Sequence, residues 1–266
     1  MLFVIEALLL ISVYLEQDHS TVEGLQLDMA LKSVDDYYLG CREEMAKRVE
    51  TEYLKKDCDG SPEFKEAWEE AKKKALNDNL IIKHENSIAI YVYTNPEIKI
   101  YDKFNNDTRN GKQNYTDMTY KWYSLQFLLT EAIKILKKTQ SKCFTTFRGT
   151  KLVFNEIALP VIRFGSFTSS SFNRDLAKRF GSKSCFEIYT CEGANVTKYS
   201  RLNYEQEVLI PPYEQFKVTA VRTRIYQKDL WCETVINLES CGMKSKLNCA
   251  LFKNTPKTIT KYYGLR

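Results

Sequence analysis

Two acidic residues, Glu205 and Glu207, stand one residue apart just before the apolar run Val208–Ile210. Such a pair can be ordinary solvated charge on a loop. It can also be a working pair in which each carboxylate has different surroundings and therefore a different role. We expect the apolar run to be a buried strand and Glu205 to lie on the loop that leads into it, SRLNYEQE.

Other groups that could join these acids occur earlier in the chain. The stretch FRGT offers Arg148, followed by Gly149, where a backbone can approach a ligand closely. The stretch RFGSFTSSS offers a run of hydroxyls over residues 168–171. Each signal is weak alone, because the arginine could be an ordinary ion-pair partner and the hydroxyl run could be an edge strand.

Several chemistries are excluded or poorly supplied. The only histidines are His19 and His84, so the sequence offers too few histidines to favour a Ser-His-Asp triad or a histidine metal site. No two glycines are two residues apart, which removes G-x-G-x-x-G, and no P-loop pattern occurs. The net charge of +5 is modest and the charges of both signs alternate, so no nucleic-acid role is expected. The side chains that remain as candidates for catalysis are carboxylates, arginines and hydroxyls.

The order of these clusters resembles a known class of enzymes. An arginine, then S-x-S, then E-x-E before an apolar strand is similar to the R-S-E class of ADP-ribosyltransferases. FRGT, RFGSFTSSS and EQEVLIPPYE resemble the vertebrate arginine-specific ecto-ADP-ribosyltransferases, as do LDMALKSVDDYYLGC, YVYT and KSKLNC. The resemblance runs from about Leu27 to Cys249.

The resemblance implies a role for each matching residue. Arg148 would brace the phosphate and ribose region of NAD, with Gly149 and Thr150 beside the nicotinamide amide. Ser169 would orient the nicotinamide ribose and the catalytic glutamate, which is Glu207. Glu205 would be the acid that accompanies transfer to arginine. The nucleotide contacts would be completed by Tyr93 and Ser200. NAD is implied as a co-substrate, and neither a permanently bound cofactor nor a metal is expected.

The chemistry agrees with this assignment. Cleavage of the bond to nicotinamide leaves an oxocarbenium-like ribose, which the Glu207 carboxylate can stabilise. A guanidinium acceptor is cationic and a poor nucleophile, so a second carboxylate, Glu205, must attract it and accept a proton. Tyr204 would offer a surface on which that guanidinium stacks.

The expected function is therefore mono-ADP-ribosyl transfer from NAD to arginine side chains of proteins, with release of nicotinamide. One alternative is an NAD glycohydrolase, in which water replaces the arginine, although the acid at Glu205 argues against it. Another is a secreted binding module of the same fold without turnover, which the intact Arg148, Ser169 and Glu207 argue against.

The elements that must position these residues change character along the chain. Helical spacing of apolar residues predicts a helix from Pro62, capped by Ser61, and a second helix from Tyr120. Between them, residues 87–94 (SIAIYVYT) are β-branched and aromatic and predict a strand. In the second half we expect short strands at CFTTFRGT, VIRFGSFTSSS, CFEIYTC, EVLI, FKVTAVRTRIY and WCETVIN, with one short helix, NRDLAKRF, capped by Asn173.

This order predicts an α+β fold, with an N-terminal helical part packed on a mixed or antiparallel sheet that carries the NAD cleft. Residues 1–20 are expected to be a signal peptide, although no Lys or Arg precedes the apolar run and Glu6 interrupts it. Residues 21–266 are expected to form a single catalytic domain with a polar C-terminal tail. No other apolar stretch is long enough to span a membrane, and no lipid-anchor signal is recognised at the C-terminus.

The cysteines and glycosylation motifs predict an extracellular, secreted protein. The eight cysteines include no C-x-x-C pair, which favours disulfides. The resemblance implies the pairs Cys41–Cys249 and Cys143–Cys191, whereas the pairing of Cys58, Cys185, Cys232 and Cys241 stays open. Glycans are expected at Asn106, Asn114 and Asn195. The protein is expected to act as a monomer on arginine-containing proteins.

Overall fold

The computed structural model describes residues 26–140, 142–154, 156–157, 159–253 and 255–263. The signal peptide predicted over residues 1–20 lies outside them.

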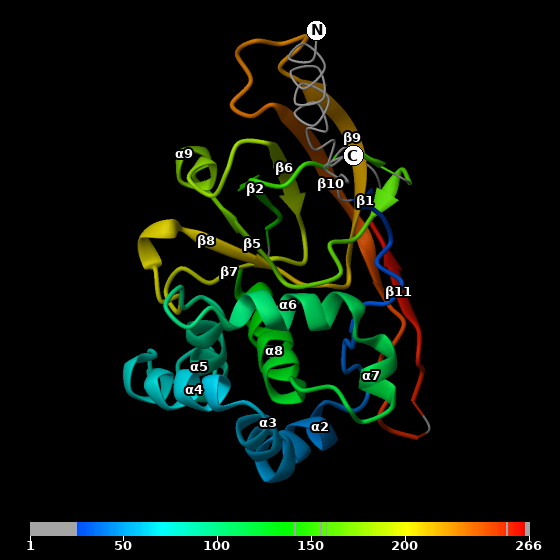
Figure 1. Ribbon diagram of the computed structural model, residues 1–266. Coiled ribbons are helices and arrows are strands. Elements are labelled where there is room, and N and C mark those ends of the chain that lie inside the picture. The colour runs from blue at the N-terminus through cyan, green and yellow to red at the C-terminus, as the bar shows by residue number, and fades with distance from the viewer. Residues whose placement is uncertain (1–25, 141, 155, 158, 254, 264–266) are drawn as a thin grey trace, which may run out of the picture.

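The first half of the described chain is helical (Figure 1). After a short strand, β1 (Gln26–Leu27), its elements are α2 (Arg42–Arg48), the π-helical turn η1 (Val49–Tyr53), α3 (Leu54–Gly60), α4 (Pro62–Lys74), α5 (His84–Tyr93), α6 (Ile100–Asn110), α7 (Lys112–Thr116) and α8 (Tyr123–Thr139).

Both predicted helices are confirmed. The first is α4, and Ser61 caps it by accepting a hydrogen bond from the Phe64 amide at 3.2 Å. Pro62 follows in the first turn, where its missing N–H costs nothing. The second is α8, which begins three residues later than predicted, at Tyr123, and has Lys137 and Lys138 in its last turn.

The strand predicted over residues 87–94 is wrong, because this segment belongs to α5. All residues of the helix from Asn86 to Tyr93 are buried. A helix that is covered on every side shows no amphipathic period, so composition alone suggested a strand. Packing against α4 and α8 decided the conformation instead.

The second half of the chain is built mainly of strands. Its elements are β2 (Phe144–Thr150), β3 (Glu156–Ile157), β4 (Val161–Ile162), β5 (Thr168–Ser171), α9 (Arg174–Lys178), β6 (Ser184–Thr190), β7 (Ala194–Asn195), the 3-10 turn η2 (Asn203–Glu205), β8 (Glu207–Ile210), β9 (Glu214–Thr223), β10 (Thr234–Ser245) and β11 (Ile259–Tyr262). Asn173 caps α9 as predicted, accepting hydrogen bonds from the amides of Asp175 and Leu176. The predicted strand VIRFGSFTSSS is two separate strands, β4 and β5.

The expected α+β fold with a mixed sheet is confirmed. Nine strands form one open sheet in the order β4-β9-β10-β6-β2-β5-β8-β7, with β11 paired to β10. The pairs are antiparallel except for β6 and β10, which run parallel. A separate two-stranded parallel ladder joins β1 to β3. The helical half lies against one side of this sheet, with α8 and α6 next to it (Figure 1).

A buried ion pair ties the start of the described chain to the sheet. The Arg163 guanidinium, which follows β4, is 1% exposed and meets Asp35 at 2.5 Å. Its other donors reach the carbonyls of Met29, Ala30 and Lys244. Asp35 and Ala30 are buried with this charge, whereas Met29 and Lys244 are partly buried, and the four hydrogen bonds offset the cost of removing the guanidinium from water.

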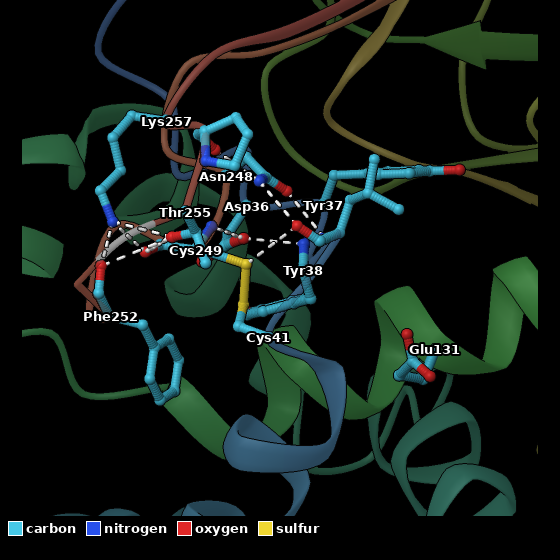
Figure 2. Close-up of a disulfide and its surroundings, with 12 residues drawn as sticks. Asp36, Tyr37, Tyr38, Cys41, Glu131, Asn248, Cys249, Phe252, Thr255 and Lys257 are labelled. Carbon is cyan, nitrogen blue, oxygen red and sulfur yellow. Dashed lines mark hydrogen bonds between the residues drawn. A yellow bond between two sulfur atoms is a disulfide. The ribbon is translucent and has the colours of Figure 1, made fainter.

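Three disulfides are present. The structure pairs Cys41 with Cys249 and Cys143 with Cys191, and it also pairs Cys185 with Cys232, which the sequence had left open. Cys58 and Cys241 are free thiols. Figure 2 shows the Cys41–Cys249 bridge, which links the segment before α2 to the segment after β10.

Candidate active site

Glu207 begins strand β8 and is 4% exposed. The strand lies between β5 and β7, and all of its residues are buried. The Ser200 hydroxyl donates a hydrogen bond to Glu207 Oε2 at 3.0 Å. A carboxylate is thus held in a fixed place at the mouth of a buried strand.

Glu205 ends the 3-10 turn η2, as expected for a residue on the loop before the strand. Gln206 follows in the left-handed conformation with φ 52°, which separates the turn from β8. The Ser171 hydroxyl donates to the Glu205 carbonyl at 2.7 Å and holds the turn against β5. Glu205 is consequently half-buried, whereas Glu207 is buried.

Both acids line one cleft together with Arg148 and Ser169. The full lining is Phe147, Arg148, Gly149, Ser169, Ser170, Ser171, Ala177, Phe180, Glu205 and Glu207. Arg148 Nη1 donates to the Ser169 carbonyl at 2.7 Å, which fixes the guanidinium across β2 and β5. Three clusters that lie far apart in the sequence therefore meet at one place.

Burial raises the pKa of both acids, and the pKa of Glu207 is raised by more than that of Glu205. The pKa of Glu207 is raised to about 7, mainly because the side chain is buried, and the charge of Glu205 contributes in the same direction. Hydrogen bonds from Ser169 and Ser200 and the charge of Arg148 act in the opposite direction. The pKa of Glu205 is also raised by burial. Burial lowers the pKa of Arg148, while the negative charge of Glu207 opposes that shift.

Two of the expected nucleotide contacts stand behind the cleft. Tyr93 is buried on α5, where its hydroxyl donates to the Phe167 carbonyl and accepts from Asn105, both at 3.0 Å. Burial raises the pKa of Tyr93 to about 12, and the charge of Glu207 is among the other causes. Ser200 faces Glu207. Neither residue is among those that line the cleft, and their contact with the nucleotide stays a prediction.

Gly149 and Thr150 take part in local packing. A Cβ on Gly149 would lie 2.4 Å from the carbonyl oxygens of Ala177 and Gly181, so the glycine allows α9 to pack on β2. The Thr150 hydroxyl accepts a hydrogen bond from the Leu152 amide at 2.8 Å, and Thr150 does not line the cleft. Gly149 also lines the cleft, so its expected close approach to a ligand stays a prediction.

Several residues that contribute to this cleft were not predicted from the sequence, and three of them matter most for its shape. Phe147 and Phe180 line it, and Ser171 positions Glu205. Phe180 follows α9 and is 55% exposed. The signal for Ser171 was available in the hydroxyl run, but only the ladder between β5 and β8, which pairs Ser171 with Glu207, shows which hydroxyl reaches the turn.

A larger hollow of about 810 Å³ opens elsewhere, lined by lysines, tyrosines and the Cys143–Cys191 bridge. It shares no lining residue with the cleft and contains none of the expected site residues. Within the described ranges, no three His, Cys, Asp or Glu side chains gather where they could hold a metal ion. The cleft with paired carboxylates is therefore the site with recognisable chemistry.

The three predicted glycosylation sites differ in their exposure to solvent. Asn106 on α6 and Asn114 on α7 are exposed. Asn195 on β7 is half-buried, and its side chain accepts a hydrogen bond from the Thr197 amide at 3.0 Å.

Comparison with known proteins gives consistent matches over most of the chain. Residues 27–245 match the family model described as NAD:arginine ADP-ribosyltransferase. The erythroblast NAD(P)(+)--arginine ADP-ribosyltransferase of Gallus gallus is 32% identical, over 87% of this chain and 78% of the relative. Ecto-ADP-ribosyltransferase 5 of Homo sapiens is 34% identical, over 73% of this chain and 72% of the relative.

Solved structures agree. The crystal structure of the eukaryotic mono-ADP-ribosyltransferase ART2.2 is 30% identical, with a TM-score of 0.70, and the match covers 85% of this chain and 98% of that one. A mutant of the same enzyme in complex with NAD matches with a TM-score of 0.72 over the same shares of each chain.

Proposed function

This chain belongs to the NAD:arginine ADP-ribosyltransferase family, and we propose that its cleft transfers ADP-ribose from NAD to arginine side chains of proteins, with Glu207 and Glu205 in separate roles. The observation that carries this proposal is the pair of acids on one cleft. One is buried beside Arg148, and the other is half-buried on the adjoining turn.

Glu207 serves the cleavage step. The bond between ribose C1′ and the nicotinamide nitrogen breaks, and its electron pair leaves with neutral nicotinamide. The ribose becomes oxocarbenium-like, and an ionised carboxylate stabilises that positive charge. Ser200 holds Glu207 in place at 3.0 Å, and Arg148, fixed on the Ser169 carbonyl, supplies a positive group for the phosphate and ribose part of NAD.

Glu205 serves the acceptor. The incoming guanidinium carries a positive charge, so its nitrogen attacks C1′ only as it loses a proton. A half-buried carboxylate on η2 can attract this group from solvent and accept the proton as the new bond from nitrogen to C1′ forms. Tyr204, which is exposed beside Glu205 on the same turn, offers a ring for stacking.

Labelled NAD and agmatine test this division. We expect Glu207→Gln to lower both arginine transfer and NAD cleavage by at least roughly 100-fold, because an amide cannot stabilise the cation. Glu205→Gln should lower transfer by roughly 100-fold and retain NAD cleavage by water. The measurement follows the label into ADP-ribosyl-agmatine and into free ADP-ribose for each variant.

Other outcomes would contradict the proposal. If the wild-type protein released only free ADP-ribose, it would be an NAD glycohydrolase. Intact NAD would mean a binding module without turnover. Unchanged transfer by Glu205→Gln would refute the separate roles of the two acids.

Related proteins are named ecto-enzymes, which places this chain's relatives outside the cell or at its surface. None of the helices in the described part of the chain is both long and apolar enough to cross a membrane. We propose that the protein is released from the cell as a monomer and acts extracellularly on arginine-bearing proteins. In this proposal residues 21–266 form one catalytic domain, and Asn106, Asn114 and Asn195 carry glycans. Three disulfides support an oxidising compartment. Fractionation of medium and membranes would test its release.

A further inference from the structure

The loop between β9 and β10, residues 224–233, carries the two most exposed large apolar side chains in the described part of the chain. Ile225 is 83% exposed and Tyr226 is 88% exposed. The loop projects beyond the sheet at the end of these two long strands (Figure 1). Placing adjacent apolar side chains in water is unfavourable, so the exposed pair needs an explanation.

The loop is braced rather than loosely connected. The amides of Tyr226 and Gln227 both donate to the Thr223 carbonyl at 3.1 Å, and the Arg224 amide donates to the Glu233 carbonyl at 2.8 Å. The Cys185–Cys232 disulfide attaches its far end to β6. An ordered loop that presents apolar side chains has already lost much of the conformational entropy that binding would cost.

The same loop adjoins the catalytic cleft. The Trp231 ring meets Phe147 edge-on, with ring centroids 6.2 Å apart, and Phe147 lines the cleft. Trp231 Nε1 also donates to Glu187 at 3.1 Å. The Glu233 amide donates to the Ser182 carbonyl at 2.9 Å, just after Phe180, which lines the cleft and is itself exposed. The Ile225–Tyr226 tip thus belongs to a braced loop that borders the cleft.

We propose that Ile225 and Tyr226 form a docking surface for the protein that presents the target arginine, and that they bind an apolar patch on that protein. The inference rests on the proposed function, because the cleft accepts only one side chain and the rest of the acceptor must lie on the surface around it. An acceptor protein is the macromolecule that the reaction brings to this surface. Adjacent apolar side chains on an ordered loop bind best to a complementary apolar surface.

A peptide series tests this surface. Each peptide contains one arginine and a leucine triplet at increasing distance from it, and a matched peptide has serines in place of the leucines. We expect the wild-type protein to modify at least one leucine peptide with roughly tenfold higher kcat/KM than its serine counterpart. The double variant Ile225→Ser with Tyr226→Ser should lose this preference and keep its kcat/KM for agmatine, which cannot reach the loop.

Tyr262→Ser is the matched control, because Tyr262 is also highly exposed but lies on β11, and it should keep the leucine preference. The proposal fails if no leucine peptide is preferred at any spacing, or if the double variant keeps the preference. It also fails if sedimentation shows a wild-type dimer that the double variant dissolves, because the loop would then join two copies of the chain. No transfer to agmatine by the wild-type protein would instead refute the proposed function.

Discussion

Glu207 must be ionised to stabilise a cation, yet burial works against its charge. Its pKa is raised to about 7 because the side chain is removed from water, and the nearby charge of Glu205 acts in the same direction. The nicotinamide ring of NAD is positively charged before cleavage. When that ring enters the cleft it should favour the carboxylate and lower the pKa of Glu207 in the complex.

This predicts a specific pH dependence. The Glu207 carboxylate is present above its pKa, so kcat/KM for NAD should fall as the pH drops through about 7. The profile of kcat, which reports the NAD complex, should have a midpoint at lower pH. Steady-state rates of NAD cleavage between mildly acidic and mildly basic pH measure both profiles.

Glu205→Gln provides the control for this profile. Removing the negative charge of Glu205 removes one cause of the raised Glu207 pKa, so the midpoint for NAD cleavage should move to lower pH. A midpoint that moved to higher pH, or a kcat/KM profile that was flat through neutral pH, would contradict the assigned role of Glu207.

At the level of elements, the β5 strand and the η2 turn together decide where Glu205 lies. The Ser171 hydroxyl donates to the Glu205 carbonyl at 2.7 Å and accepts from the Asn173 amide at 3.0 Å. The Phe172 amide donates to the Gln206 carbonyl at 3.1 Å. The acid expected to meet the acceptor is therefore placed by hydrogen bonds that the Ser171 hydroxyl and the Phe172 amide donate to the backbone of its turn.

Ser171→Ala should consequently uncouple the two activities. Loss of a hydrogen bond worth about 1 kcal/mol lets the turn move, so transfer to agmatine should fall roughly 5- to 10-fold while NAD cleavage changes less. The ratio of the two products measures this effect. Thr168→Val is the control, because the Thr168 hydroxyl on the same strand bonds only the Ser166 carbonyl, and it should leave the ratio unchanged. Equal losses in both activities would mean that Ser171 only supports the fold.

Elements differ in how far the sequence could predict them. Helices α4 and α8 have one apolar face each, and their periods predicted them. Helix α5 is buried on all sides and has no such period, so it was mistaken for a strand. The residue types of the cleft were readable, whereas the pairing of Ser171 with Glu207 depends on a strand register that no short-range pattern encodes.

At the level of the whole molecule, contacts between distant segments complete the fold. Strands β6 and β10 pair in parallel across a long separation, and this pairing places Cys185 opposite Val235, near Cys232. Four cysteines allow three pairings, so the sequence could not choose the Cys185–Cys232 bridge before this register was known. The buried Arg163–Asp35 pair, which the sequence analysis also missed, has the same origin in tertiary structure.

Of the three disulfides, the Cys41–Cys249 bridge joins the two cysteines that lie farthest apart in the sequence, with a separation of 208. Figure 2 shows that it is surrounded by hydrogen bonds that do not depend on it: Asp36 accepts from the amides of Tyr38 and Cys249, both at 2.8 Å. Asn248 exchanges hydrogen bonds with the backbone of Leu39. The two segments can therefore stay together in the folded protein without the covalent bond.

We accordingly predict that the double variant Cys41→Ser with Cys249→Ser keeps the fold and the kcat for agmatine. Its free energy of unfolding should fall by up to about 5 kcal/mol, because the unfolded chain gains the entropy of the opened loop. Urea unfolding followed by circular dichroism measures the loss. Cys58→Ser, which changes a free thiol, controls for the substitution itself and should change stability little. An unchanged unfolding midpoint in the double variant would contradict this prediction and show that hydrogen bonds alone hold the two ends. Loss of transfer in the folded variant would show that the bridge also shapes the cleft.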